Sequence, residues 1–347
     1  MTSDRTAALS SPQARKSGQP RFRALDVLSR QGRGMTLGVE LPLDNDFAAR
    51  GPAGKKMTST FGIPDLQQHR ERAVLADKLG FKALWLRDVP LWIPEFGDAG
   101  QVFDPFAYLG FLAGVTDNIL LGTAAVVLPL RHPLHVAKMA ATVDQLSRGR
   151  LILGVASGDR PAEYPNFGVD FESRGEQYRT AVSTLRRLWR DSAELPSASM
   201  KVLPAPHEGS IPLIAVGRAQ QSTEWVAENM DGYMTYHRPA HFMKPVTDKW
   251  KHSVPGGEYK PAITTMLVDL LDDPNAPAEP IRFGARLGRR QLQSYLCELE
   301  GAGIAHVALN FRPSSRPVVE ALEEIAEHVL PAFSGEAPEP PHGVARS

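Results

Sequence analysis

Residues 119–157 read ILLGTAAVVLPLRHPLHVAKMAATVDQLSRGRLILGVAS, and this stretch gives the clearest indication of the architecture. The apolar runs 119–129 and 150–157 each predict a buried strand. Between them, 132–149 has the apolar spacing of a helix, with a proline near its start and Gly149 at its end. Because two strands joined by a helix run parallel, the stretch predicts one β/α/β unit of a parallel sheet.

The same alternation continues on both sides of this unit. Further apolar runs predict strands at 35–41, 82–88, 211–217, 231–237, 261–271 and 304–311. Helical spacing follows each strand, at 65–80, 104–116, 173–190, 220–230, 241–252, 288–303 and 316–333. Eight such units predict an α/β protein of the (β/α)8 TIM barrel type, as a single domain over 35–333. A doubly wound sheet is the alternative, but 42–64, after the first strand, lacks its GxGxxG turn.

The segments outside this pattern are of two kinds. Residues 1–34 and 334–347 are rich in Ser, Pro and Gly and are expected to be flexible tails, the first with room for a short helix over 22–30. Three long insertions, at 42–64, 89–103 and 272–287, follow predicted strands, and a further insertion lies at 251–260. They are expected at the C-terminal face of the barrel, either as pocket walls or as contacts between subunits.

Composition excludes several classes of protein. The 39 basic and 39 acidic residues balance, so no field favours nucleic acid or an anionic membrane. One cysteine, Cys297, excludes an internal disulfide framework and a cysteine-based zinc site, and the histidines lack metal-ligand spacing. No apolar run has the length of a membrane span, and the N-terminus lacks the apolar core of a signal peptide. We therefore expect a cytoplasmic protein without a metal.

Polar loops with small residues follow the fourth and fifth predicted strands. The first contains Ser157-Gly158-Asp159, and the second contains Gly217, Arg218 and Ser222. Backbone N–H groups near glycine can cradle a phosphate, although a turn capped by aspartate explains the first loop equally well. The third strand ends in the small residues 122–125, which would let a flat group approach the backbone or simply pack tightly in the barrel.

The sequence resembles the luciferase-like flavin monooxygenases, which include bacterial luciferase, alkanesulfonate monooxygenase and deazaflavin-dependent relatives. The densest matches are LGTA, LPLRHP, VDQLSRGR and LGVASGD within 119–168, with further matches at 80–90, 104–123 and 222–234. The resemblance covers roughly 35–333. It implies a (β/α)8 barrel, in agreement with the independent count of strands.

The resemblance also implies a flavin across the mouth of the barrel. Its ring system would rest on Thr123, Ala124 and Ala125, with a cis Ala124–Ala125 peptide as in bacterial luciferase. Its phosphate would be held by both polar loops and reached by Tyr178; the phosphate-binding residues so implied are Ser157, Gly158, Asp159, Gly217, Arg218, Ser222 and Tyr178.

One departure from the family pattern concerns the acid/base group. Luciferase has a pair of histidines after its second strand, whereas this sequence has Arg87-Asp88-Val89. Asp88, with Arg87 beside it, is the nearest titratable group and the candidate acid/base. The alternative is a structural Arg87–Asp88 ion pair.

These observations predict an enzyme that uses reduced FMN and molecular oxygen to oxygenate a small organic substrate. Because no nicotinamide-binding fold is visible, a separate flavin reductase is expected to supply the reduced FMN. Trp92, Phe96 and Tyr164 are expected to line an apolar pocket for the substrate. A homodimer is expected by analogy with the family. The alternatives are hydride transfer with a deazaflavin coenzyme, and a flavin-binding protein without turnover.

Overall fold

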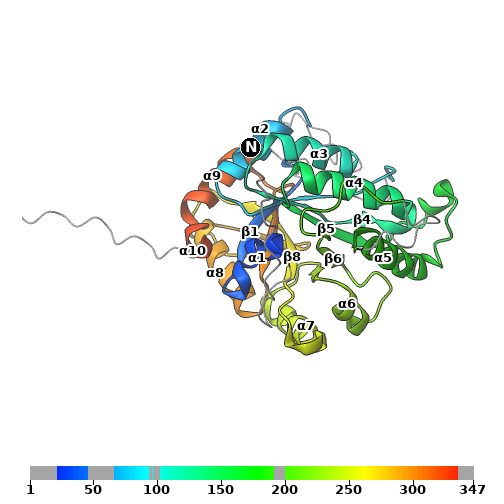
Figure 1. Cartoon of the computed structure of the whole chain (residues 1–347). Helices are drawn as coiled ribbons and strands as arrows, with labels where there is room; N and C mark the ends of the chain where they lie inside the picture. The colour runs from blue at the N-terminus through cyan, green and yellow to red at the C-terminus, as the bar shows by residue number, and fades with distance from the viewer. Residues whose placement is uncertain (1–21, 46–65, 94–95, 97–101, 191–199, 335–347) are drawn as a thin grey trace, which may run out of the picture.

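The computed structural model describes residues 22–45, 66–93, 96, 102–190 and 200–334 of the chain. Eight parallel strands form a closed barrel, because the last of them pairs with both the first and the seventh (Figure 1). In chain order these strands are β1 (Thr36–Glu40), β2 (Ala83–Leu86), β3 (Leu120–Thr123), β5 (Leu151–Ala156), β6 (Leu213–Val216), β7 (Gly232–Thr235), β8 (Ala262–Leu270) and β11 (His306–Asn310). The eight predicted strands and the (β/α)8 barrel are confirmed.

Helices surround the strands on the outside of the barrel (Figure 1). They are α2 (His69–Lys78), α3 (Pro105–Val115), α4 (Pro133–Leu146), α5 (Arg174–Arg190), α6 (Thr223–Asn229), α7 (Ala240–Ser253), α8 (Arg289–Gly301), α9 (Val318–His328) and the short α10 (Pro331–Ser334). The Asp104 carboxylate caps α3 by accepting hydrogen bonds from the N–H groups of Phe106 and Ala107, at 3.0 and 3.1 Å. None of the described helices has the length and apolar character needed to cross a membrane.

The N-terminal end of the barrel is closed by the short helix for which the sequence left room within the predicted tail. In α1 (Arg23–Leu28), the side chains of Leu25 and Leu28 are buried, as is that of Phe22 before it. They share one apolar cluster with the residues that fill the barrel, which include Ile152, Ile214, Met234 and Ile263. The predicted domain boundary at residue 35 is therefore too late, because the barrel interior needs this apolar cover. The remainder of both predicted tails, 1–21 and 335–347, lies outside the described residues.

A hydrogen-bonded chain crosses the middle of the barrel. The indole N–H of Trp85 donates to Nε2 of His306 at 3.0 Å, and Nδ1 of His306 lies 2.7 Å from the Thr36 hydroxyl. Because Nε2 accepts, the neutral ring carries its proton on Nδ1 and donates to Thr36, whose hydroxyl donates in turn to the carbonyl of Leu28. Gly122 makes room for the indole, since a Cβ there would lie 2.5 Å from Cε3 of Trp85. The chain links α1 to three barrel strands.

The buried imidazole predicts a loss of stability in acid. Burial lowers the pKa of His306 to about 3, whereas the unfolded chain takes up this proton below about 6.5. The unfolded state then binds more protons, so stability falls as the pH drops from 6.5 towards 3, by up to about 1.4 kcal/mol per pH unit. Replacing His306 by glutamine should reduce the pH dependence of the free energy of unfolding, measured with urea between these pH values. Replacing the exposed His135 by glutamine should leave this pH dependence unchanged. An unchanged slope in the His306→Gln protein would contradict this account.

The predicted insertion 272–287 contains an antiparallel hairpin that the sequence did not indicate. It is formed by β9 (Glu279–Ile281) and β10 (Gly284–Leu287), and β10 pairs in parallel with the upper half of β8. Asp269 fixes the hairpin: it binds Nε of Arg286 at 2.7 Å and accepts from the N–H and hydroxyl of Ser315 at 2.7 and 2.8 Å. A further short strand, β4 (Val126–Val127), extends β3 beside β5.

Candidate active site at the barrel mouth

The inward-facing residues of the barrel are fully buried near the starts of the strands and only half-buried near their C-terminal ends. Ile152 and Ile214 point inward and are fully buried. Four residues further along β5, Ala156 is only half-buried, as are Val216, two residues further along β6, and Ala124, just after β3. Because alternate residues of a strand face the same side, these three side chains lie on the inner side of the barrel and are partly exposed at the C-terminal ends of the strands. This is the face that carries active sites in TIM barrels.

The peptide bond at this inner surface has the geometry expected from the resemblance. The Ala124–Ala125 peptide is cis. The N–H of Ala124 donates to the carbonyl of Leu86 at 2.6 Å, which ties this peptide to β2. Thr123 does not reach this surface: its side chain is fully buried, and its hydroxyl donates to the carbonyl of Gly154 at 2.7 Å. Thr123 therefore joins β3 to β5.

The two polar loops lie side by side. Val155 of β5 pairs with Ala215 of β6, so Ser157 and Gly217 leave neighbouring strands at the same level. Gly158 and Gly217 have left-handed backbones, with φ of 80° and 66°. Ala219 and Gln220 are left-handed too, at 46° and 62°. Such successive turns direct backbone N–H groups toward one point and form concavities that bind anions.

Gln221, which the sequence did not indicate, holds the second loop in place. Its side-chain N–H groups donate to the carbonyls of Gly175 and Ala219, both at 2.8 Å, and its carbonyl oxygen accepts from Arg179 at 3.1 Å. Ser222 caps α6 by accepting from the N–H of Trp225 at 3.1 Å. Arg218 and Asp159 are exposed beside these loops. The predicted phosphate loops are thus brought together, and their ligand remains a prediction.

Tyr164 was predicted to line the pocket, and the structure corrects this. Its side chain is fully buried, and its hydroxyl donates to the carbonyl of Ser157. Burial raises the pKa of Tyr164 to about 12, so the hydroxyl remains protonated and can donate. Its ring meets that of Phe171 edge-on at 4.9 Å. Tyr164 therefore supports the Ser157–Asp159 loop from below.

Tyr178 is enclosed in the packing between helices. The side chain is fully buried, its hydroxyl lies 3.8 Å from the sulfur of Met230, and its ring packs near Trp225. Burial raises the pKa of this phenol. The position argues against the expected contact with a phosphate, because the hydroxyl points into the layer between α5 and the barrel.

Arg87 and Asp88 do not pair with each other. Asp88 accepts from Nε and Nη2 of Arg131 at 3.0 and 2.8 Å and from the N–H of Val127 at 3.1 Å. Arg87 instead lies on the opposite side of the strand, with Nε 3.5 Å from Oε1 of Glu40. The alternative of a structural Arg87–Asp88 ion pair is therefore wrong, because consecutive residues of an extended chain face opposite sides. The enclosed position of Asp88 also argues against a role in acid/base catalysis.

Glu40 is the carboxylate that faces the mouth. Thr36 and Gly38 point into the barrel toward His306, so Glu40, two residues further, continues on the inner side. On the neighbouring strand, the N–H of Arg312 donates to the side chain of Asn310 at 3.0 Å. Glu40, Arg87, Asn310 and Arg312 thus end three adjacent strands. The signal in the sequence was an acidic residue at the end of an apolar strand.

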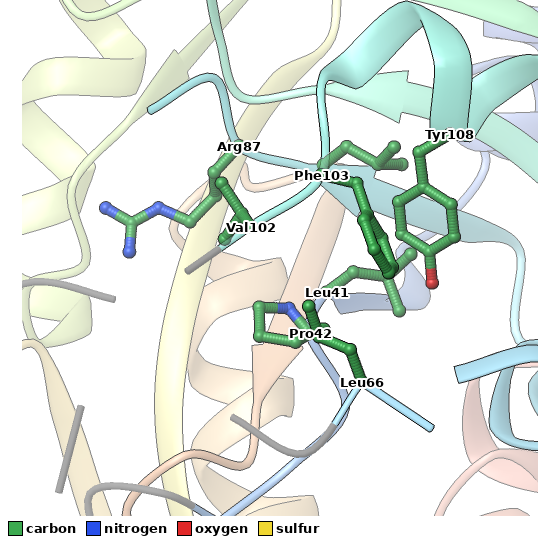
Figure 2. A pocket seen from close by; sticks show the side chains of 8 residues that line it. Leu41, Pro42, Leu66, Arg87, Val102, Phe103 and Tyr108 are labelled. Atoms are coloured by element: carbon green, nitrogen blue, oxygen red, sulfur yellow. The ribbon is translucent and has the colours of Figure 1, made fainter. Parts of the chain in front are cut away.

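A small apolar cavity lies beside this cluster, between the ends of β1 and β2 and the start of α3 (Figure 2). Leu41, Phe103 and Tyr108 contribute to its walls, and Arg87 extends away from the two aromatic rings (Figure 2). Of the predicted pocket residues, Trp92 is largely exposed, whereas the ring of Phe96 lies under the Arg160 guanidinium at 4.7 Å. A role for these two residues in binding substrate stays a prediction. Among the described residues, no three His, Cys, Asp or Glu side chains gather as a metal site.

A closed (β/α)8 barrel is the scaffold on which TIM-barrel enzymes carry their active sites, at the C-terminal ends of the strands. The sequence pattern of the luciferase-like monooxygenase family matches residues 36–276, and the chain belongs to this family. Its members are flavin-dependent monooxygenases and oxidoreductases that act on small molecules.

The alkanal monooxygenase alpha chain of Photorhabdus luminescens is 26% identical over 162 residues, which make up 45% of this chain and 43% of that protein. The chain therefore matches less than half the length of this relative. An F420-dependent secondary alcohol dehydrogenase, solved with an F420–acetone adduct, has a TM-score of 0.68 at 17% identity. The FMN-bound oxygenating constituent of 3,6-diketocamphane monooxygenase from Pseudomonas putida has a TM-score of 0.63 at 13% sequence identity. Each match covers 86% of this chain and 99% of the other, and both show the fold.

Proposed function

We propose that the protein is the oxygenase of a two-component system, which uses reduced FMN and molecular oxygen to oxygenate a small organic substrate. The observation that carries this proposal is the partly exposed inner surface at the C-terminal ends of the strands, formed by Ala124, Ala156 and Val216 and flanked by two loops with left-handed residues. A flat ring system fits over small side chains, and a phosphate fits between loops that direct N–H groups toward it. Bound FMN would supply the redox chemistry, while the chain would orient it and exclude water.

Each residue group has a proposed task. Ala124 and Ala125 would support the flavin ring. The phosphate would be held by the backbone and side chains of the two loops, namely Ser157, Gly158, Asp159, Gly217, Arg218 and Ser222. Trp92 and Phe96 would line the part of the pocket that holds the substrate. Thr123 and Tyr164 would act indirectly, by holding the inner surface and the first loop in position.

Glu40 is proposed to handle the proton in place of the family histidine. Its carboxylate is on the inner side of the barrel, and its ion pair with Arg87 holds it at the mouth. Asp88, by contrast, has its carboxylate occupied by Arg131 and Val127. A positioned carboxylic acid can deliver or accept a proton at a reacting group within hydrogen-bond reach.

The Glu40 proposal predicts a change in pH dependence. Replacing Glu40 by glutamine keeps the size of the side chain and removes the titrating group. The oxidation of protein-bound reduced FMN by oxygen, followed by stopped-flow absorbance, should slow several-fold and lose its pH dependence near neutrality. Asp88→Asn should keep the parent profile. If Asp88→Asn slowed the reaction and removed its pH dependence while Glu40→Gln kept the parent profile, the acid/base role would belong to Asp88.

Two partners are proposed with the cofactor. A separate flavin reductase would supply reduced FMN, in line with the solved structural relative named as an oxygenating constituent. A second copy of the chain would cover α3, which has no charged residue along its length and exposes Phe111, with Phe103 exposed just before it. A surface helix that is apolar on all sides is typical of one that is covered. Light scattering that gives the mass of one chain would contradict the homodimer.

Hydride transfer with a deazaflavin coenzyme remains the second candidate, because a solved relative with this fold contains F420. The test is titration of the full chain with FMN, riboflavin and F420, each oxidised and reduced. The FMN proposal expects the tightest binding for reduced FMN, and weaker binding for riboflavin because it lacks the phosphate. Preference for reduced F420 would support the alternative. FMN binding without accelerated oxygen consumption would indicate a binding protein without turnover, and binding of neither cofactor would exclude both enzyme proposals.

A further inference from the structure

Two exposed aromatic rings form a stack beside the barrel mouth. Tyr236 follows β7 and Phe283 precedes β10, and their ring centroids are 5.2 Å apart with an angle of 23° between the planes. The two residues remain 59% and 40% exposed. The guanidinium of Arg282 lies 5.1 Å from the centroid of Phe283. Stacked rings with this exposure present an apolar face to whatever lies next to them.

The stack faces the open side of the barrel. The N–H of Leu267 on β8 donates to the carbonyl of Phe283 at 3.0 Å, and β8 pairs with β7 through Thr264 and Thr235. The two rings therefore meet across β8. The outer face of β8 is closed, because Met266 and Val268 belong to the main core. Rings as exposed as these lie over its inner face, where Leu267 is half-buried.

The backbone on both sides of the stack is held rigidly. His237, next to Tyr236, is buried, and its Nε2 lies 2.9 Å from the Tyr295 hydroxyl on α8. The hairpin that carries Phe283 is fixed by Asp269 through Arg286 and Ser315. The stack is therefore pre-formed, which lowers the entropy lost when a ligand binds.

The backbone conformation of Phe283 also indicates a functional ring. Its φ is 56°, in the left-handed region that glycine occupies most readily. A bulky residue in this region is an outlier that persists where the surroundings require it. A glycine would suit the turn better, so the position keeps its phenyl ring in spite of the backbone.

We propose that Tyr236 and Phe283 form an aromatic platform that stacks on the planar aromatic part of the substrate. This assignment rests on the proposed function in placing the substrate at the mouth. Ala124, Ala156, Val216 and the two polar loops lie at the ends of β3, β5 and β6. The platform lies at the end of β7 and the start of β10, on either side of β8, so cofactor and substrate would occupy separate sectors of the mouth. The protein would thus favour aromatic over saturated substrates.

Two probes with the same charge test the platform. Calorimetric titration of the full chain should show tighter binding of 2-naphthoate than of its saturated decahydro analogue. The substitutions Tyr236→Leu and Phe283→Gly should each weaken the binding of 2-naphthoate about three- to tenfold. They should leave the affinity for the saturated analogue unchanged. Phe283→Gly suits the left-handed turn, so it should fold like the parent. Phe242→Leu removes an exposed ring of α7 and should change neither affinity.

The outcomes separate this inference from the proposed cofactor. Equal affinities of the parent for both probes, or unchanged 2-naphthoate affinity in the two platform variants, would overturn the platform. A loss of FMN affinity in those variants would overturn it as well, because the rings would then hold the cofactor. Absence of FMN binding in the parent would refute the proposed function and leave the result with the two probes standing.

Discussion

Replacing Arg131 by methionine should lower the free energy of unfolding by about 3–5 kcal/mol, as expected when one partner of a buried ion pair is removed. The side chain of Asp88 is only 1% exposed, and Arg131 supplies two of its three hydrogen bonds. Without the guanidinium, the carboxylate would remain buried with one backbone N–H as its partner. Arg131 also binds Asp104 at 3.0 Å, so the change would loosen the start of α3 as well.

Urea unfolding of four proteins measures this effect. Arg131→Lys should lower the free energy of unfolding less than Arg131→Met does, because lysine keeps the positive charge although it lacks the bidentate geometry of the guanidinium. Adding Asp88→Asn to Arg131→Met should recover a large part of the loss, because no buried charge then remains. Lys244→Met breaks an exposed pair with Asp248 and should cost less than about 1 kcal/mol. Equal losses in the single and double variants would show that the stem of Arg131, and not its charge, stabilises the protein.

The architecture was predictable because each element carries its own signal. Buried parallel strands appear as apolar runs, and helix starts such as Asp104-Pro105 are marked by capping residues. Two features lacked such signals, namely the packing of α1 against the barrel and the hairpin. α1 was expected only as a short helix within a tail, because six residues are too few for a periodic pattern. The hairpin of β9 and β10 contains Pro280 and Gly284, and its position is set by pairing with β8.

The candidate site was predictable in part, for a different reason. The polar loops were found because small and polar residues follow apolar strands, and strand order alone brings Ser157 and Gly217 together. Partners distant in sequence could not be found in this way. Asp88 binds a residue 43 positions away, and Phe283 reaches Tyr236 from the insertion at 272–287. Strand alternation, however, already indicated that Arg87 and Asp88 face opposite sides.

Replacing Gly158 by valine should weaken FMN binding by about 100-fold or more. Gly158 has a φ of 80°, and a Cβ there would lie 2.4 Å from the hydroxyl oxygen of Tyr164 and 2.8 Å from Cγ1 of Val127. Because a β-branched residue is an outlier at this φ and the ring beneath it is buried, the loop must move away. The loss of two hydrogen bonds to a charged phosphate accounts for a change of this size.

Riboflavin and a second glycine provide the controls for this measurement. Riboflavin has no phosphate, so its affinity should change far less than that of FMN in fluorescence titrations of the Gly158→Val protein. Gly168→Val imposes the same kind of backbone strain, since its φ is 66°, but a Cβ there meets nothing within 4 Å. The Gly168→Val substitution should lower the melting temperature without weakening the binding of FMN. If Gly158→Val bound FMN as tightly as the parent, Ser157-Gly158-Asp159 would be a turn that ends β5, and the phosphate would have to be sought at another part of the mouth.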